Sequence, residues 1–246
     1  MADPRFYCSE PISSCQALEL PAALAHHVRV RRLEANSTLI LFDGRGGEIA
    51  GTLHFQDKKA SVLLGEHRST ESELNGEITL LQGLPAGDKM DWIIEKAVEL
   101  GVTKIIPVAA QRSVLKLSGP RLEKRLEHWR AIIVSASEQC GRNRLMQIRA
   151  PQSFEQAISE APPGLHLLCD PEAAHTLAEQ LTAENKTQKN IRSVSLLIGP
   201  EGGWSPEETS VAAAQQVVAV KFGLRVLRTE TAGIALAAAT AALLGW

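Results

Sequence analysis

The sequence has few cysteines, and they lie far apart. Its 246 residues include only Cys8, Cys15, Cys140 and Cys169. No Cys-x-x-Cys pair and no histidine at metal-ligand spacing accompanies them, so neither a disulfide framework nor a metal site is predicted. A reducing compartment fits these cysteines best.

Long hydrophobic runs are also missing. No apolar stretch approaches the ~18 residues of a membrane-spanning helix. The first fourteen residues carry an acid and a proline where a signal peptide would have a basic start and an apolar run. We therefore expect a cytoplasmic protein with no membrane partner. With 44% hydrophobic and 22% charged residues, the chain has the composition of an ordinary globular protein of one or two domains.

Excess charge of one sign is absent overall, since the net charge is only −2. The charges are nevertheless unevenly distributed. Residues 104–150 hold ten Lys and Arg against three acids, whereas residues 151–220 hold three against nine. One face can therefore meet a polyanion while the rest keeps the chain soluble. Solvated charges on the surface of a helix over 121–130 explain half of the basic residues equally well.

The first seventy residues have the pattern of short strands. Two apolar segments, Ser37–Phe42 and Glu48–Phe55, flank the glycine-rich turn Asp43–Gly47, which is typical of a hairpin. A polar, linker-like stretch follows at His67–Gly76. We predict a small β-rich domain over residues 1–72 and a second domain over residues 73–246.

The second domain alternates apolar strands with helical periods. The expected strands are Ile78–Gln82, Lys104–Ala109, Leu165–Cys169, Val194–Ile198 and Val217–Val220. The expected helices are Lys89–Leu100, Pro120–Glu138, Pro171–Leu181, Pro206–Gln215 and Thr231–Leu244. Strands that are apolar throughout and separated by helices predict an α/β fold, with a parallel sheet covered on both faces.

The carboxyl ends of these strands are the expected ligand site. One strand runs into Gly199–Trp204, where three glycines provide open backbone, and Ser205, Pro206 and Glu208 then predict a capped helix start. The loop is neither a G-x-G-x-x-G turn nor a P-loop. On spacing alone, such a glycine-rich loop is more often a plain turn than a binding loop.

Two further strand ends carry features of interest. The segment Gly223–Ala232 places two arginines between leucines and leads into an alanine-rich helix, Gly233–Leu244. So little side-chain bulk implies that a loop, a ligand or a second subunit approaches this backbone closely. The segment Leu167–Pro171 ends a third strand and can line the same crevice.

Taken together, Leu196–Gly203 and Leu224–Ala232 resemble the paired signature of the SPOUT methyltransferases, and specifically the RsmE group, which methylates N3 of a uridine in small-subunit 16S ribosomal RNA. The resemblance runs nearly end to end. Two positions depart from it: Gln111 stands where an acid is common, and Leu224 replaces a frequent proline. Further matching blocks are Arg5 with Tyr7, His26 with Arg29, Val30 and Arg32, Phe42–Gly44, Asp91–Gly101, Arg112 with Ser113 and Lys116, and Glu138–Arg144.

The resemblance implies a PUA-like β-barrel that binds RNA, followed by a SPOUT domain with a C-terminal trefoil knot. It also implies a homodimer with the site near its interface and S-adenosylmethionine as cofactor. The expected partner is small-subunit ribosomal RNA within the assembled 30S subunit. The residues expected to bind the cofactor are Leu168, Cys169, Leu197, Ile198, Gly199, Pro200, Glu201, Gly202, Gly203, Leu224, Val226, Leu227, Arg228, Thr229, Thr231 and Ala232.

The implied chemistry requires the anion of uridine N3, aligned with the methyl group to be transferred. By the resemblance, the expected catalytic residues are Arg142, Arg144, Glu138, Arg228 and Glu230. A cap or a buried ion pair is at least as good a role for either acid, so no general base is chosen. The residues expected to contact RNA are Arg5, His26, Arg29, Arg32, Arg112, Ser113, Arg142 and Arg144.

Two other functions fit the same sequence. The fold can direct the methyl group to a ribose 2′-hydroxyl, as other SPOUT branches do. A non-catalytic RNA-binding factor for ribosome assembly is the second alternative, although the intact cofactor signature argues against it.

Overall fold

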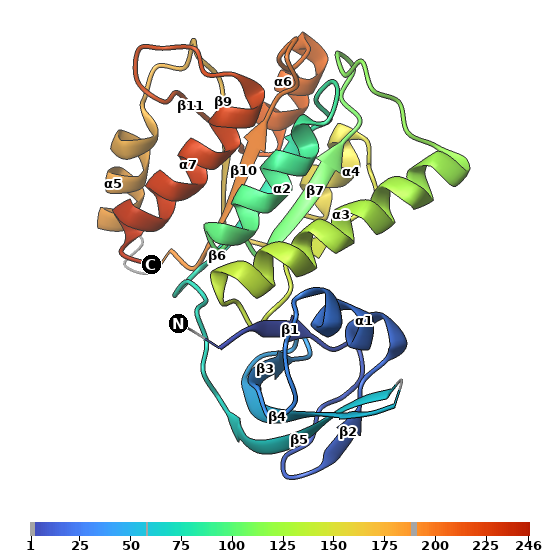
Figure 1. Cartoon of the computed structure of the whole chain (residues 1–246). Coiled ribbons are helices and arrows are strands. Elements are labelled where there is room, and N and C mark those ends of the chain that lie inside the picture. The colour runs from blue at the N-terminus through green and yellow to red at the C-terminus, as the bar shows by residue number, and fades with distance from the viewer. Residues whose placement is uncertain (1–2, 58, 188–190) are drawn as a thin grey trace. The chain divides into compact units, whose positions relative to one another are not determined.

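The computed structural model describes residues 3–57, 59–187 and 191–246. The chain forms two compact units (Figure 1). The first comprises the residues up to Glu73 together with Val134–Leu145, and the second comprises Leu74–Ile133 together with Met146–Trp246. The predicted boundary near residue 72 thus falls next to a division of the structure, but a second, later segment also belongs with the first unit.

The first unit is built on a five-stranded sheet. Its elements are β1 (Arg5–Tyr7), β2 (Ala17–Glu19), α1 (Ala22–Val30), β3 (Thr38–Phe42), β4 (Glu48–Gln56) and β5 (Lys59–Arg68), with strand order β1-β3-β4-β5-β2. The expected hairpin is present, because β3 and β4 pair antiparallel with Leu41 opposite Ile49. Alternate residues such as Leu39, Leu41 and Leu53 are fully buried, so the sheet packs one face on the core.

Residues 134–145 complete this unit from a distant part of the chain. They are the last turns of α3 (Gly119–Cys140) and the segment that follows it. The Gly46 N–H donates to the Asn143 carbonyl oxygen (3.2 Å), and the Leu145 N–H donates to the Gly44 carbonyl oxygen (3.3 Å). The hairpin turn thus holds the segment through backbone hydrogen bonds.

The second unit is an α/β domain with a six-stranded sheet whose neighbouring strands are all parallel. The strand order is β11-β9-β10-β6-β7-β8. The bounds are β6 (Glu77–Gly83), β7 (Lys104–Val108), β8 (Gln147–Ile148), β9 (Leu165–Cys169), β10 (Ser193–Ile198) and β11 (Val218–Val220). The five strands expected from apolar periodicity and the parallel α/β class are confirmed.

Helices lie on both faces of this sheet (Figure 1). On one face, residues of α4 (Phe154–Ser159) and α6 (Pro206–Ala214) pack on side chains such as Leu81 and Leu197. On the other face, α7 (Thr229–Leu244) packs on β6 and β10 and contacts α2 (Lys89–Glu99) and α5 (Leu177–Thr187). Successive strand residues point to opposite faces of the sheet. Because helices cover both faces, the strands are apolar at successive positions.

One predicted helix start was wrong. We expected a helix from Pro171, but α5 begins at Leu177. The Asp170 side chain instead accepts the Glu172 N–H (2.9 Å) and holds a turn. Thr176 then exchanges hydrogen bonds with Glu179, as in a capping box, and fixes the later start. The short helices α1 and α4 were not predicted. In the part of the chain that the structure describes, no helix is both long and apolar enough to span a bilayer.

Candidate active site

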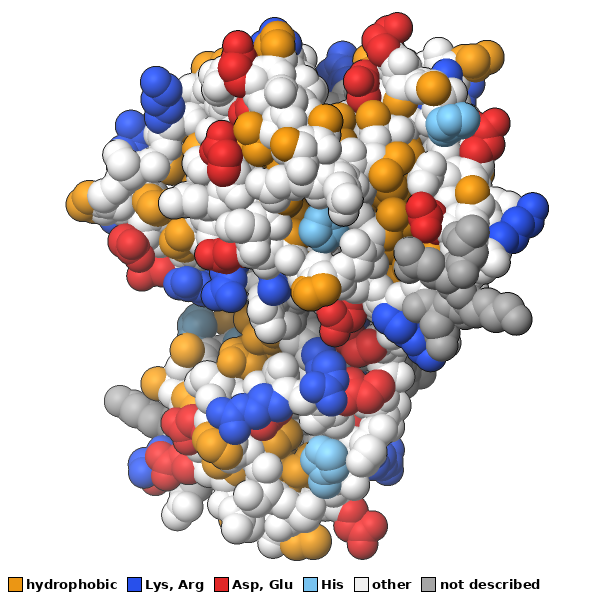
Figure 2. All heavy atoms as spheres, turned by 180° about the vertical axis from the view of Figure 1, so that it is seen from behind, with side chains coloured by type: hydrophobic (Ala, Val, Ile, Leu, Met, Phe, Trp, Pro, Cys, Tyr) orange, Lys and Arg blue, Asp and Glu red, His pale blue; other side chains and the backbone are white. Residues whose placement is uncertain are grey.

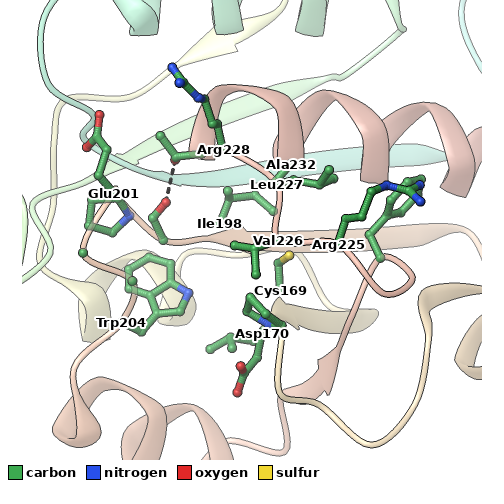
Figure 3. Close-up of a pocket in the computed structure, with 18 of the residues that line it drawn as sticks. Cys169, Asp170, Ile198, Glu201, Trp204, Arg225, Val226, Leu227, Arg228 and Ala232 are labelled. Carbon is green, nitrogen blue, oxygen red and sulfur yellow. Dashed lines mark hydrogen bonds between the residues drawn. The ribbon is translucent and has the colours of Figure 1, made fainter.

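A cleft of about 620 Å³ opens at the carboxyl ends of β9 and β10, in the second unit (Figure 3). Three segments supply most of its lining: the end of β9, the loop after β10, and the chain that enters α7. This is the edge where an open parallel sheet binds its ligands. The lining residues are Lys89, Leu168, Cys169, Asp170, Pro171, Ile198, Gly199, Pro200, Glu201, Gly202, Gly203, Trp204, Thr209, Phe222, Arg225, Val226, Leu227, Arg228, Thr229 and Ala232.

Most residues expected to bind the cofactor line this cleft, and three do not. Leu197 is fully buried, because its side chain points to the face of the sheet that packs on α4 and α6. Leu224 is 97% exposed, and Thr231 lies on the exposed side of α7. Sequence reasoning missed Lys89, Thr209 and Phe222, which lie outside the segments it singled out. Trp204 and Arg225 lie within those segments but were not among the residues expected to bind the cofactor.

The first residue of the loop after β10 is tied to the start of α7. The Thr229 hydroxyl donates to the Gly199 carbonyl oxygen at 2.6 Å (dashed line in Figure 3). The same hydroxyl accepts a hydrogen bond from Gln82 Nε2 at 2.9 Å. Gln82 is fully buried at the end of β6. A central strand therefore fixes the position of two of the segments that line the cleft.

An ionic cluster holds the middle of the same loop. Glu201 accepts hydrogen bonds from Lys89 Nζ (2.7 Å) and from the Ala86 N–H (3.1 Å). Burial acts to raise the pKa of Glu201, but the bonds from Lys89 and the backbone outweigh it, so this pKa lies below its ordinary value. Lys89 also lies 3.4 Å from the Glu230 carboxylate. The bonds to Glu201, followed by those to Glu230, raise the pKa of Lys89 and keep it a cation.

The end of the loop is held by α6 and by the segment after β7. Ser205 and Glu208 form the expected capping box, with Pro206 in the first turn, so the predicted start of α6 is confirmed. Glu208 also accepts the Gln111 N–H at 2.9 Å. Arg112 Nη1 donates to the carbonyl oxygens of Gly202 (2.9 Å) and Trp204 (3.1 Å). Ser113, beside it, is buried rather than exposed.

The cleft is lined by the half-buried Cys169 and the buried Trp204 and, at exposed positions, by Arg225 and Arg228. Burial, followed by the charge of Asp170, raises the pKa of Cys169 to about 11, so this thiol stays protonated near neutral pH. The indole of Trp204 is 8% exposed, and its Nε1 has no hydrogen-bond partner among the described residues. Arg225 and Arg228 extend away from Trp204 at the edge of the cleft (Figure 3).

Three of the five residues expected to be catalytic lie in the first unit rather than at this cleft. Arg142 is 3% exposed and donates to both carboxylate oxygens of Glu73, at 3.0 and 2.6 Å. Arg144 is mostly exposed and lies 3.2 Å from Glu71. Glu138 accepts the Tyr7 N–H at 2.9 Å. Burial raises the pKa of Glu138, and the Tyr7 N–H and nearby positive charges only partly oppose the shift. Arg228 and Glu230 belong to the second unit.

The residues expected to contact RNA differ in how accessible they are. His26 and Arg29 on α1, and Arg32 just after it, are exposed, and the Arg29 guanidinium lies 5.5 Å from the centre of the Phe55 ring. Arg5, in contrast, pairs with Glu48 and donates to Asn143 Oδ1. On the face shown in Figure 2, basic and acidic side chains lie side by side. Within the first unit, Arg142 and Arg144 also pair with acids, Glu73 and Glu71.

Comparisons with known proteins agree with this architecture. Residues 72–241 match the family model described as an RNA methyltransferase domain, and residues 20–63 match the RNA methyltransferase PUA domain. Ribosomal RNA small subunit methyltransferase E of Bacillus subtilis is 32% identical over 227 residues, covering 91% of this chain and 89% of the relative. Its Synechocystis counterpart is 34% identical over 216 residues, covering 87% and 69%.

Solved structures extend the agreement to three dimensions. The methyltransferase E of Neisseria gonorrhoeae, crystallised with S-adenosylmethionine, has a TM-score of 0.86 at 33% identity over 98% of both chains. A Legionella pneumophila protein, also solved with this cofactor, has a TM-score of 0.88 at 32% identity over 98% of both chains. The fold and the cleft therefore define an RNA methyltransferase with an N-terminal PUA domain. Within that class, the chain belongs to the ribosomal RNA small subunit methyltransferase E family, which confirms the resemblance seen in the sequence.

Proposed function

We propose that this protein transfers a methyl group from S-adenosylmethionine to N3 of a specific uridine in 16S ribosomal RNA. The observation that supports the proposal is the cleft itself. The two segments that carry the family signature meet there with the end of β9, around open glycine backbone. Family membership and the cofactor-bound relatives support the same reading.

The residues of the cleft fit the cofactor. Leu168, Ile198 and Leu227 offer an apolar slot for an adenine ring, and the adjacent backbone offers donors and acceptors for its edge. The buried Nε1 of Trp204, which has no hydrogen-bond partner among the described residues, provides one more donor. When bound, S-adenosylmethionine supplies an electrophilic methyl group on a sulfonium. The chain's own task is to position that group and the uridine.

Charged residues of both units serve the substrate in this proposal. Arg228, exposed at the edge of the cleft, stabilises the anion that develops on the uracil ring. Lys89 pairs with Glu201 and lies 3.4 Å from Glu230, so it offsets part of the negative charge that would otherwise repel that anion. On the first unit, the exposed His26, Arg29, Arg32 and Arg144 bind phosphates, which positions the RNA without reading its sequence. Arg142, bonded to Glu73, supports that unit from within.

The proposal extends to the setting of the reaction. The enzyme acts in the cytoplasm on RNA within the 30S subunit, as a homodimer with a trefoil knot at its C-terminal segment. The alanine-rich face of α7 supports close packing of this helix, because small side chains let neighbouring backbones approach. The knot and the dimer stay predictions.

The decisive experiment follows tritiated methyl transfer from S-adenosylmethionine to assembled 30S subunits and to naked 16S RNA. We expect label in 30S subunits at one uridine, and mass spectrometry should place the methyl group on N3. A methyl group on the ribose, detected by resistance of the adjacent linkage to alkali, would assign the chain to 2′-O methylation instead. Cofactor binding without any transfer would favour a non-catalytic assembly factor.

A further inference from the structure

The segment that follows β7 reaches across to the cofactor loop through one side chain. Arg112 lies four residues after the end of β7, and its Nη1 donates to the carbonyl oxygens of Gly202 and Trp204, at 2.9 and 3.1 Å. These carbonyls lie on either side of Gly203, whose φ is +67°. The guanidinium therefore holds the backbone on both sides of this left-handed residue.

The two segments approach closely at Gly202 and at Glu208. A Cβ built on Gly202 would lie 3.1 Å from the Cβ of Arg112, so no side chain separates the two backbones. Immediately before it, the Gln111 N–H donates to buried Glu208 of the α6 capping box. Displacement of Arg112 would therefore shift the backbone at Trp204, whose buried indole lines the cleft.

The loop needs an external support of this kind. Two adjacent glycines leave its backbone with more conformational freedom than any other pair of residues would. Within the loop, the Gly203 N–H bonds to the Pro200 carbonyl oxygen at 2.9 Å. A planar guanidinium with fixed donors loses little entropy when it bonds to two acceptors, and bonds from a charged donor are stronger than neutral ones.

The surroundings of Arg112 argue against a role as a phosphate contact alone. Glu207, in the first turn of α6, has a lowered pKa because of its own backbone N–H and the Ser205 side chain, and the charge of Arg112 adds to the effect. The Arg112 guanidinium is also already engaged by the Gly202 and Trp204 carbonyl oxygens through Nη1.

We infer that Arg112 is a positioning residue for the cofactor loop, and that it holds Gly202–Trp204 in the shape that binds S-adenosylmethionine. This inference rests on the proposed function. It replaces the expectation that Arg112 serves RNA alone, and it predicts that the loss of Arg112 affects cofactor binding even when no RNA is present.

The test compares full-length variants by calorimetric titration with S-adenosylmethionine in the absence of RNA. We expect Arg112→Met to weaken binding about tenfold, since it removes two charge-assisted bonds at a partly exposed site. Arg112→Lys should bind with intermediate affinity, because one ammonium can reach one carbonyl. Lys116→Met, an exposed change in the same segment, should bind like the wild type.

A second measurement follows the loop directly. Hydrogen exchange of the Gly203 amide, read without any ligand, should be faster in Arg112→Met than in Lys116→Met. If both variants exchange like the wild type and Arg112→Met keeps full cofactor affinity while RNA binding falls, the inference is overturned and Arg112 is an RNA contact. If the wild type binds no S-adenosylmethionine, the proposed function fails, and the exchange of Gly203 still decides the role of Arg112.

Discussion

The hydroxyl of Thr229, the first residue of α7, lies 2.6 Å from the carbonyl oxygen of Gly199, thirty residues earlier in the chain. Buried Gln82 donates to the same hydroxyl from β6. One hydroxyl thus joins three segments at the edge of the sheet. No local sequence pattern in any of these segments indicates that it contacts the other two. The order of the cleft depends on contacts of this kind.

Replacement of Thr229 by valine tests this connection. Valine keeps the shape of the side chain but removes the hydroxyl's bond to the Gly199 carbonyl oxygen and one of the two bonds of Gln82 Nε2, which keeps only its bond to the Gly83 carbonyl oxygen. We expect Thr229→Val to lower the free energy of unfolding by about 1–3 kcal/mol and to weaken S-adenosylmethionine binding. Urea unfolding and calorimetric titration measure the two effects. Thr229→Ser keeps the hydroxyl and serves as the matched control. Equal behaviour of valine and serine would show that the hydroxyl does not hold the loop.

Arg142 and Arg144 are two residues apart but should respond very differently to alanine. Arg142 is buried against Glu73, so Arg142→Ala leaves a poorly solvated carboxylate and should cost about 3–5 kcal/mol of unfolding free energy. The pair of Arg144 with Glu71 is more exposed, and Arg144→Ala should cost under about 1 kcal/mol.

The effect on RNA binding should be larger for Arg144→Ala, the variant that costs less stability. Arg144→Ala should reduce the salt dependence of RNA affinity by about one released counterion, as expected for one lost phosphate contact. Binding measured over a series of salt concentrations gives this slope. An unchanged slope for Arg144→Ala would remove this residue from the RNA surface.

These two arginines also show how far sequence reasoning reaches. Periodicity predicted the strands of the parallel sheet, because buried strands are apolar throughout and each is bounded by a helix. The Ser205 and Glu208 spacing predicted the start of α6, since a capping box is a local structure. Arg142 and Arg144 share a motif and a charge, yet only the folded chain shows that Glu73 buries one of them.

The parts of the site that sequence missed are held by contacts between distant residues. Lys89 lines the cleft because it bonds to Glu201, 112 residues later in the chain. No sequence pattern near Lys89 predicts that partner. The start of α5 was wrong for a local reason instead. Asp170 and Thr176 form competing side-chain bonds to the backbone, which a proline-based helix start does not anticipate.

Stability should depend on pH through Glu138. Burial raises its pKa, so the folded state holds this proton more tightly than the unfolded state does. Glu138 therefore disfavours folding at a pH above its folded pKa, and the penalty is lost as the pH falls through that pKa toward the unfolded value. Glu138→Gln, which still accepts the Tyr7 N–H, should be more stable relative to wild type at about pH 7 than at about pH 4. Urea unfolding at both values checks this. A constant difference between the two proteins would contradict the role of burial.

The last prediction concerns removal of the first unit. A chain that begins at Leu74 keeps every residue that lines the cleft. The lining residues alone would therefore predict that the truncated chain folds and binds the cofactor. The segment Val134–Leu145 argues otherwise. Its Asn143 side chain donates to the Thr70 carbonyl oxygen at 2.7 Å, and its Arg142 bonds to Glu73, so these two bonds are lost on truncation.

We therefore expect the truncated chain to expose residues 134–145. Limited trypsin digestion should cleave it after Arg142 or Arg144, whereas both bonds should resist cleavage in the full-length protein under the same conditions. Because α3 continues directly into this segment, fraying should spread into its last turns and lower the helical signal in circular dichroism. Supplying residues 1–73 as a separate chain should restore protection if the segment truly belongs to that unit. Protection of Arg142 and Arg144 in the truncated chain alone would show that the segment is held without the first unit, and the boundary near residue 72 would then suffice to separate the two domains.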